Sequence, residues 1–209
     1  MTKNKTKEKV VEAASLLFYQ KGFDGTSVRD IANKANVNVS LISYYFNGKQ
    51  GLLEYAVTNY YETYITLIKE ELEKNAALDE LSQLKNLIYA IIKYKMEHYQ
   101  LTAFIQRELT LDSTFVREMT VTYLAKENHL LQKLFFNILH PKHKQMQGHL
   151  YMQLKGMFMS PFLFKDELNY HFIDETSIHH FTKTFTKTIH LWLDVLVGNA
   201  VETPSVQSH

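Results

Sequence analysis

The chain has 209 residues, of which 45% are hydrophobic and 22% are charged, and it contains three prolines, seven glycines and no cysteine. This composition excludes an intrinsically disordered chain, a disulfide framework and a thiolate metal site, and the scarcity of breakers favours long helices. With 23 Lys and Arg against 22 Asp and Glu, no global positive charge draws the whole molecule onto nucleic acid.

The N-terminus is charged rather than apolar. Lysines alternate along residues 3–9, no signal-peptide apolar stretch follows, and no window approaches the roughly 18 apolar residues of a membrane span. We therefore expect a soluble cytoplasmic protein. Up to Tyr60 the chain holds eight basic and five acidic residues, so a mildly basic first part precedes a mildly acidic remainder. This distribution fits a DNA contact near the N-terminus.

The first predicted helix covers residues 7–21. Its apolar residues recur at helical spacing, and Gly22 follows a basic last turn, as a C-terminal glycine does. A second, shorter helix begins after Thr26 or Ser27, because either hydroxyl can cap exposed helix amides. It ends near Asn36, a residue type that tolerates the left-handed conformation of a tight turn.

A third helix follows this turn. Asn38 or Ser40 can cap it, and the breaker Asn47-Gly48 ends it. Three short helices in about 40 residues are typical of a helix-turn-helix. The sequence therefore predicts a helix-turn-helix DNA-binding domain over residues 1–47.

The rest of the chain is predicted to be helical, because no run with the two-residue period of a strand competes. Further amphipathic helices are expected over 49–72, 78–98, 100–110, 112–139, 143–164 and 175–198. Pro141 separates two of them, and Pro161 is expected to end or kink the next. The expected fold is all-α, with the head followed by a dimerisation and regulatory domain over 48–198 and a frayed tail over 199–209.

Polar side chains gather where a helix-turn-helix meets DNA. The second helix of this motif presents its N-terminal side chains to base edges, while the preceding helix crosses the phosphate backbone. Thr26 and Ser27 offer hydroxyls and free amides to a phosphate oxygen, a role compatible with capping. The polar candidates for base contact on the third helix are Asn38, Ser40, Ser43 and Tyr44.

The head resembles the TetR family of regulators. The resemblance is carried by Gly22-Phe23, Gly25-Thr26-Ser27-Val28, Ile31-Ala32, Ala35-Asn36-Val37, Ile42, Tyr45-Phe46 and Lys49. It implies a homodimer that binds a palindromic operator, usually as a repressor. It also implies that Tyr45 and Lys49 contact phosphates, and that the surface from Asn38 to Tyr44, Val39 included, reads bases.

Two residues depart from the family pattern. Asn36 stands where the turn glycine is usual, and it keeps the left-handed option open. Ser43 stands where a tyrosine is common, which we expect to change the sequence preference rather than to abolish DNA binding. For the body, the family resemblance implies only an all-helical architecture.

A further pattern reaches into the body and comprises Val37-Asn38-Val39, Ile42-Ser43-Tyr44-Tyr45-Phe46, Arg107-Glu108, Asp112-Ser113-Thr114 and Arg117-Glu118. It is similar to the RefZ (regulator of FtsZ) type of bacilli, TetR-like proteins that bind DNA and act on FtsZ. This resemblance implies an alternative function, in which a DNA-bound regulator contacts a cell-division protein. Arg107, Glu108, Arg117 and Glu118 are then a candidate partner patch, since arginine is enriched at such anchors. A salt-bridged surface without a partner is the other interpretation.

Two segments late in the chain are too apolar for an exposed surface. Residues 146–164 and 181–196 carry most of the late methionines and aromatics. Packed as helix pairs across a two-fold axis they form a four-helix dimer interface, as the family resemblance also implies. The candidate interface residues are Met152, Met159, Phe185 and Trp192, and an intrachain core remains the alternative.

The sequence gives little support for metal binding or catalysis. His140 and His143 flank a predicted helix break, and the neighbours His179 and His180 point about 100° apart on a helix. No nearby carboxylates stand at ligand spacing, and no phosphate-binding loop or nucleophile motif is present. We therefore expect no metal, no cofactor and no enzyme activity. A small apolar effector between the body helices would act by changing the separation of the heads, but nothing in the sequence identifies one.

Overall fold

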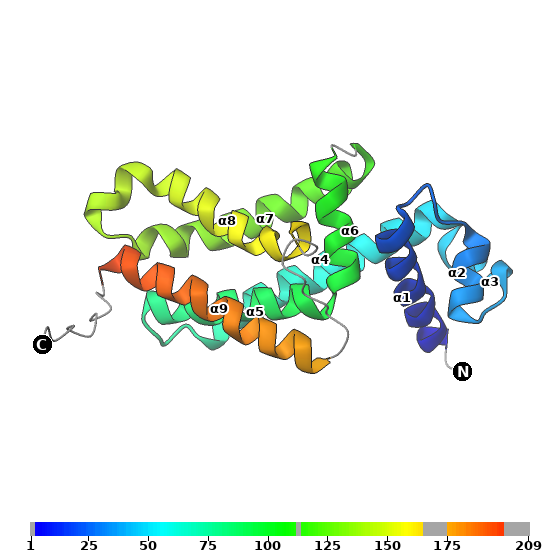
Figure 1. The fold of residues 1–209 in the computed structure, drawn as a ribbon, viewed down its shortest axis with the longest axis horizontal. Helices are drawn as coiled ribbons and strands as arrows, with labels where there is room; N and C mark the ends of the chain where they lie inside the picture. The colour runs from blue at the N-terminus through cyan, green and yellow to red at the C-terminus, as the bar shows by residue number, and fades with distance from the viewer. Residues whose placement is uncertain (1–2, 112–113, 165–174, 199–209) are drawn as a thin grey trace, which may run out of the picture.

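The computed structural model describes residues 3–111, 114–164 and 175–198, and every regular element in these ranges is a helix (Figure 1). In the head, α1 spans Lys3–Lys21, α2 Val28–Ala35 and α3 Val39–Phe46. The body comprises α4 Lys49–Lys74, α5 Glu80–Glu97, α6 Tyr99–Thr110, α7 Thr114–Ile138, η1 Pro141–Met146, α8 Gln147–Leu163 and α9 Glu175–Val197. The predicted all-α fold class is confirmed.

The head is held together by one apolar face from each of its three helices. Val10, Ala14 and Phe18 follow one another at four-residue spacing on α1 and are fully buried. Ile31 of α2 and Ile42 of α3 are also fully buried in the same core. Helices α2 and α3 have only eight residues each, so their ends depend on capping side chains.

The structure selects one residue from each pair of predicted caps. Ser27 caps α2 in a capping box, in which its hydroxyl accepts from the Asp30 amide and its amide donates to the Asp30 carboxylate, both at 3.1 Å. Asn38 caps α3, because its Oδ1 accepts from the Ser40 amide at 2.9 Å. Between them, Asn36 has the predicted left-handed conformation with φ 52°. These contacts set the angle between the two helices of the motif.

The long helix α4 leaves the head and runs into the body, where it packs against α5 and α7 (Figure 1). Helix α9 packs on α5, and α8 packs on α6. The head helix α1 packs on α2 and also on α6 of the body. Head and body are therefore joined both by the continuous helix α4 and by the contact between α1 and α6.

The connection between α7 and α8 differs from the expectation. Pro141 begins the 3-10 helix η1, and α8 begins only at Gln147. Pro161 is buried within α8, which ends two residues later. A proline cannot donate to the carbonyl four residues back, and here the Ser160 hydroxyl donates to that carbonyl, of Met157, at 3.1 Å. The expected tail over 199–209 lies outside the described residues.

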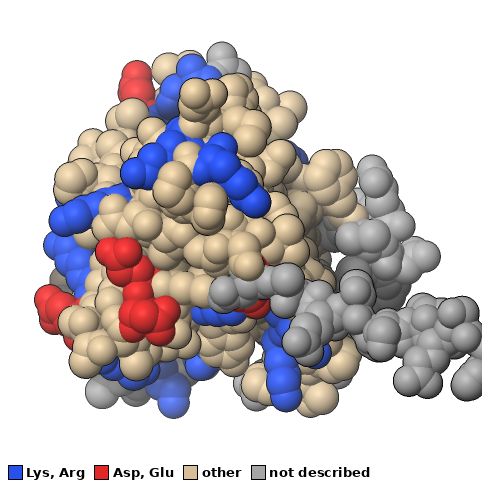
Figure 2. All heavy atoms as spheres, turned by 90° about the vertical axis from the view of Figure 1, so that its left-hand side faces the viewer, with Lys and Arg blue, Asp and Glu red and all other residues tan. Residues whose placement is uncertain are grey.

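Basic residues are not confined to the head. Figure 2 shows the end of the body opposite the head, where several Lys and Arg side chains gather in the upper part of the view. Residues 128–165 contain no Asp or Glu, and the connection at this end contributes Lys142 and Lys144. Positive charge alone therefore does not single out the head.

Candidate nucleic-acid interface

Helix α3 turns one face into the head and leaves the other at the surface. Ile42 and Phe46 are buried, whereas Tyr44 is 73% exposed. Ser40 and Ser43 are exposed on the same helix. A helix eight residues long, anchored by two buried side chains, thus presents hydroxyl groups to its surroundings. These are the groups that make hydrogen bonds to base edges in a major groove.

Both ends of α3 are fixed by asparagines. Asn38 Oδ1 accepts from the Ser40 amide and, at 2.7 Å, from the Ser40 hydroxyl. Asn47 adopts the left-handed conformation after the helix, with φ 58°. Val39, at the start of the helix, is 38% exposed. The predicted base-reading surface from Asn38 to Tyr44 is therefore ordered and accessible.

Tyr45 lies beside this surface and is half-buried. Its ring centroid is 5.0 Å from that of Tyr44, and the Lys7 Nζ of α1 lies 5.7 Å from the Tyr45 ring. The same ammonium lies 5.3 Å from the ring of Tyr55 on α4. A cation of the first helix is thus held close to the tyrosine for which a phosphate contact is predicted.

The start of α4 lies next to the end of α3. Gly48 precedes α4, and no side chain caps its first turn, so its first amides are available to an anion. Lys49 follows, with its Nζ donating to the Phe23 carbonyl at 2.8 Å and lying 4.2 Å from the Phe23 ring centroid. An ammonium has three protons, so this contact orients Lys49 without using all its donors.

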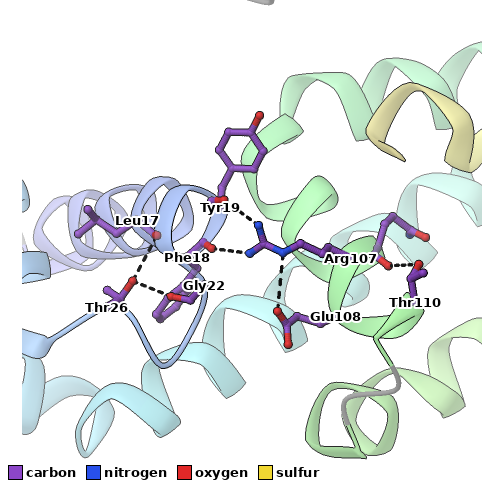
Figure 3. Close-up of polar contacts among 9 residues, drawn as sticks. Leu17, Phe18, Tyr19, Gly22, Thr26, Arg107, Glu108 and Thr110 are labelled. Atoms are coloured by element: carbon purple, nitrogen blue, oxygen red, sulfur yellow. Dashed lines mark hydrogen bonds and ion pairs between the residues drawn. The ribbon is translucent and has the colours of Figure 1, made fainter. Parts of the chain in front are cut away.

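Thr26 and Ser27, both predicted phosphate contacts, have different surroundings. Thr26 is buried, and its hydroxyl donates to the carbonyls of Leu17 at 3.2 Å and Gly22 at 2.8 Å (Figure 3). The expectation that this hydroxyl faces DNA is corrected by the structure, because it is used inside the head. Ser27 is exposed, and its hydroxyl donates to Asp30 at 2.8 Å. The hydrogen bonds from Ser27 lower the pKa of the Asp30 carboxyl.

The four residues of the predicted partner patch are also in different surroundings. Arg107 is half-buried, and its guanidinium donates to backbone carbonyls of the head helix α1 (Figure 3). Glu108 lies beside it, with 3.9 Å between the Arg107 Nε and a carboxylate oxygen. Arg117 and Glu118 are exposed on α7. The first pair therefore has a role within the chain, and a partner surface remains a prediction.

The apolar residues predicted for a dimer interface are partly turned into the chain. Met152 is 70% exposed on α8, whereas Phe185 stacks on Phe181 at 5.2 Å and Trp192 stacks on Phe135 at 6.1 Å. Met159 is half-buried. The same helices also carry Leu163, Leu191 and Val195, which are more exposed than Met159, Phe185 and Trp192 but are not among the four predicted interface residues. The spacing of apolar residues predicts which side of a helix is apolar. It does not predict which of these residues pack inside the chain and which remain exposed.

Sequence reasoning also missed a charged cluster inside the body. Glu127 of α7 is buried and pairs with the Lys155 Nζ at 2.8 Å, while the Tyr64 hydroxyl donates to it at 2.7 Å. Lys95 of α5 is buried nearby, with its Nζ 4.9 Å from the Tyr64 ring centroid. The sequence signal for such a cluster is a single Glu or Lys at a helix position that the apolar spacing assigns to the core. This signal is weak, because neighbouring positions in the sequence are charged as well.

The described residues contain neither a metal-ligand cluster nor a membrane-spanning helix. In that part of the chain no three His, Asp or Glu side chains come together in a way that could hold a metal ion. None of the helices described there is both long and apolar enough to cross a membrane. The polar face of α3 remains the best-defined candidate site.

Comparison with known proteins adds family relationships. Residues 10–56 match the family described as bacterial regulatory proteins, tetR family. The chain is 38% identical to the probable HTH-type transcriptional regulator YttP of Bacillus subtilis (strain 168) over 194 residues, which cover 90% of this chain and 92% of that protein.

Two other matches differ in extent. Over 77 residues, or 37% of this chain and 42% of that protein, the chain is 29% identical to IcaR of Staphylococcus epidermidis, named as the negative transcriptional regulator of the biofilm operon icaADBC. The structure of the fatty acid degradation regulator FadR from Bacillus halodurans superposes with a TM-score of 0.63 at 21% identity, covering 92% of this chain and 96% of that one. This last likeness concerns the fold alone.

Proposed function

The chain belongs to the tetR family of bacterial regulatory proteins, and from this premise we propose that it is a homodimeric repressor that binds a palindromic operator. Each protomer places α3 in a major groove, and the two copies of α3 enter successive grooves about 34–36 Å apart. The observation that carries the proposal is the exposed polar face of α3, which is fixed at its start by the cap Asn38 and at its end by Asn47 in a left-handed conformation.

Base reading is assigned to Ser40, Ser43 and Tyr44, whose side chains are exposed on this face. Tyr44 is 73% exposed. Its hydroxyl can donate to or accept from a base edge, and its ring can contact a thymine methyl group. Changing it should therefore alter which sequence is preferred.

Phosphate contact is assigned to groups around the start of α4 and the exposed Ser27. The uncapped first turn of α4, Tyr45 and Lys49 lie together next to α3. Amides at a helix N-terminus and an ammonium both attract a phosphate oxygen, whatever the base sequence. Their loss should weaken binding to every duplex and reduce its dependence on salt.

Dimerisation is assigned to the outer faces of α8 and α9. Met152 and Leu163 on α8 and Leu191 and Val195 on α9 are exposed large apolar side chains. A soluble monomer rarely exposes so many on adjacent segments. Covering them with the same face of a second copy gives a two-fold axis, and that axis requires a palindromic site.

Repression is the proposed direction of control. The similar protein IcaR, which matches this chain over 77 residues, is named a negative transcriptional regulator. A bound dimer at a promoter blocks access by occupying the grooves. The cell-division partner suggested by Arg107, Glu108, Arg117 and Glu118 and the small apolar effector remain predictions from the sequence.

The test is selection of bound duplexes from a random DNA pool, followed by affinity measurements on the enriched sequence at several salt concentrations. The wild-type protein should enrich a palindrome, and log affinity should fall linearly with log salt. Tyr44→Ala should enrich a different sequence at one position in each half-site. Val121→Ala, which truncates an exposed side chain on the body helix α7, should leave the selected sequence unchanged. Failure of the wild type to enrich any duplex would refute the proposal.

A further inference from the structure

Arg107 of the body helix α6 reaches the C-terminal end of the head helix α1. Its Nη2 donates to the Phe18 carbonyl at 2.9 Å and its Nη1 to the Tyr19 carbonyl at 3.1 Å (Figure 3). Both carbonyls belong to the last turn of α1, which ends at Lys21. The Phe18 carbonyl also accepts from the Gly22 amide at 2.9 Å, and Arg107 adds donors from the body to this end of a head helix.

The guanidinium suits this position. Its planar fork presents two N–H groups in parallel, which matches two successive carbonyls, and its charge is favourable at the negative end of the helix dipole. The fork also lies 5.8 Å from the ring centroid of Phe104, and the Phe104 ring is 5.5 Å from that of Phe18. Arg107 is therefore held by contacts on both helices.

The same turn of α1 is bonded from the opposite direction by the start of the helix-turn-helix. The buried Thr26, just before α2, donates to the carbonyls of Leu17 and Gly22. Leu17, Phe18, Tyr19 and Gly22 thus accept bonds in one short stretch, from the head through Thr26 and from the body through Arg107 (Figure 3). The Thr26 bonds hold this turn inside the head, so a rotation of the head relative to the body has to break or bend the two Arg107 bonds.

We propose that Arg107 is a positioning residue for DNA binding, which fixes the orientation of the head on the body and so the separation of the two recognition helices. This rests on the proposed function, because the separation matters only in a dimer on a two-part site. When the two heads are already held at one separation, binding to an operator of matching spacing costs less orientational entropy, and the affinity is higher. The same stiffness penalises operators whose half-sites are closer together or further apart.

The first experiment measures affinity for a series of duplexes with identical half-sites and a centre lengthened or shortened by one or two base pairs. Wild type should bind one spacing best. Arg107→Gln should weaken binding at that spacing by about tenfold, as expected when a charge-assisted bond no longer orders the head. At the other spacings it should lose only about twofold, so its spacing profile becomes flatter. Lys93→Gln, on the exposed surface of α5, is the matched control and should keep the wild-type profile.

The second experiment measures head separation without DNA. The chain has no cysteine, so Lys34→Cys on the exposed surface of α2 provides one spin-label site per protomer. The distance distribution between the two labels should be narrow with Arg107 and broader with Arg107→Gln. Arg107→Lys keeps the charge but loses the fork, and it should give an intermediate width and an intermediate spacing profile.

The outcomes separate the two proposals. If wild type enriches no duplex, the proposed function fails, while the distance distributions still test the role of Arg107. If wild type binds DNA but Arg107→Gln and Arg107→Lys show unchanged widths, or lose affinity equally at every spacing, the positioning role is overturned. If Arg107→Gln does not unfold cooperatively, Arg107→Lys alone decides.

Discussion

Among single residues, Glu127 has the most demanding surroundings. It is buried between α4, α7 and α8, where the Tyr64 hydroxyl and the Lys155 ammonium contact its carboxylate. Burial raises the pKa of this carboxyl, but the nearby ammonium groups of Lys155 and Lys95 lower it by more than burial raises it. The pKa therefore lies below its ordinary value. Burial lowers the pKa of Lys95. The body thus encloses two cations with one anion.

This imbalance predicts opposite effects for two substitutions. Glu127→Gln leaves the buried Lys95 and the half-buried Lys155 without an anion, and the free energy of unfolding should fall by about 3 kcal/mol. Lys95→Met removes one cation at similar length and leaves the pair of Glu127 with Lys155, and the free energy of unfolding should rise by about 1 kcal/mol. Urea denaturation measures both. Destabilisation by Lys95→Met would show that its ammonium is needed in the core.

The lowered pKa of Lys95 also predicts a pH dependence. Between that lowered pKa and the ordinary value of 10.5, the unfolded chain binds more protons at this site than the folded chain, so stability rises with pH. The advantage of Lys95→Met over wild type should therefore shrink as the pH is raised from 7 towards 10. For Glu127 the slope has the same sign, because its lowered pKa makes the unfolded chain bind more protons below 4.5, and stability is lost as the pH falls through the lowered pKa. Denaturation curves at several pH values test both, and a constant advantage of Lys95→Met would contradict the first.

Among the elements, α3 and α4 meet at a junction with little free space. An added Cβ at Gly51, in the first turn of α4, would lie 1.9 Å from the Phe46 carbonyl oxygen at the end of α3. Backbone atoms cannot approach a side-chain carbon so closely, so this position requires glycine. The junction carries the C-terminal end of the recognition helix and the uncapped start of α4, and a small shift would displace both.

Gly51→Ala should therefore lower the free energy of unfolding by about 2 kcal/mol through overpacking, and it should also weaken binding to the selected operator. Gly148→Ala is the matched control, since an added Cβ there meets nothing within 4 Å. It should stabilise the chain by about 0.5 kcal/mol, because it restricts the unfolded state. Thermal unfolding and operator titration check both variants, and equal effects of the two would show that the close approach to Phe46 is relieved elsewhere.

For the whole molecule, the question is which surface joins two copies. The outer faces of α8 and α9 expose Met152, Leu191 and Val195, while glycines on α8 leave open space beside them. Head orientation then depends on the entire path from this face through α6 to α1. In the proposed dimer, DNA binding therefore depends on the geometry of the dimer interface, although the helices assigned to the two roles are far apart in the sequence.

Val195→Glu should dissociate the dimer, because it buries an unpaired carboxylate on each side of the two-fold axis. We expect the dimer to be roughly a hundredfold weaker, measured by sedimentation equilibrium. Val121→Glu is the matched control, with 57% exposure on α7 against 61% for Val195 on α9, and it should leave the dimer intact. A monomer from Val121→Glu and a dimer from Val195→Glu would place the interface on α7 instead.

The sequence by itself determined much of the local structure. Apolar spacing located the helices to within a few residues, and the left-handed Asn36 followed from the conformations that asparagine tolerates. The polar face of α3 followed from the order of its side chains along one short helix. These properties depend on residues close together in the sequence, so the sequence alone was enough to predict them.

Only the tertiary structure decided the roles that depend on distant partners. Thr26 proved to be buried against α1, Arg107 to bind the end of α1, and Glu127 to share the core with two lysines. Trp192 packs on Phe135, whereas Val195 on the same helix is exposed. Each role depends on which helices pack together and on how each helix is rotated about its own axis. That rotation decides whether a side chain lies in the core, at the contact between head and body, or on the surface.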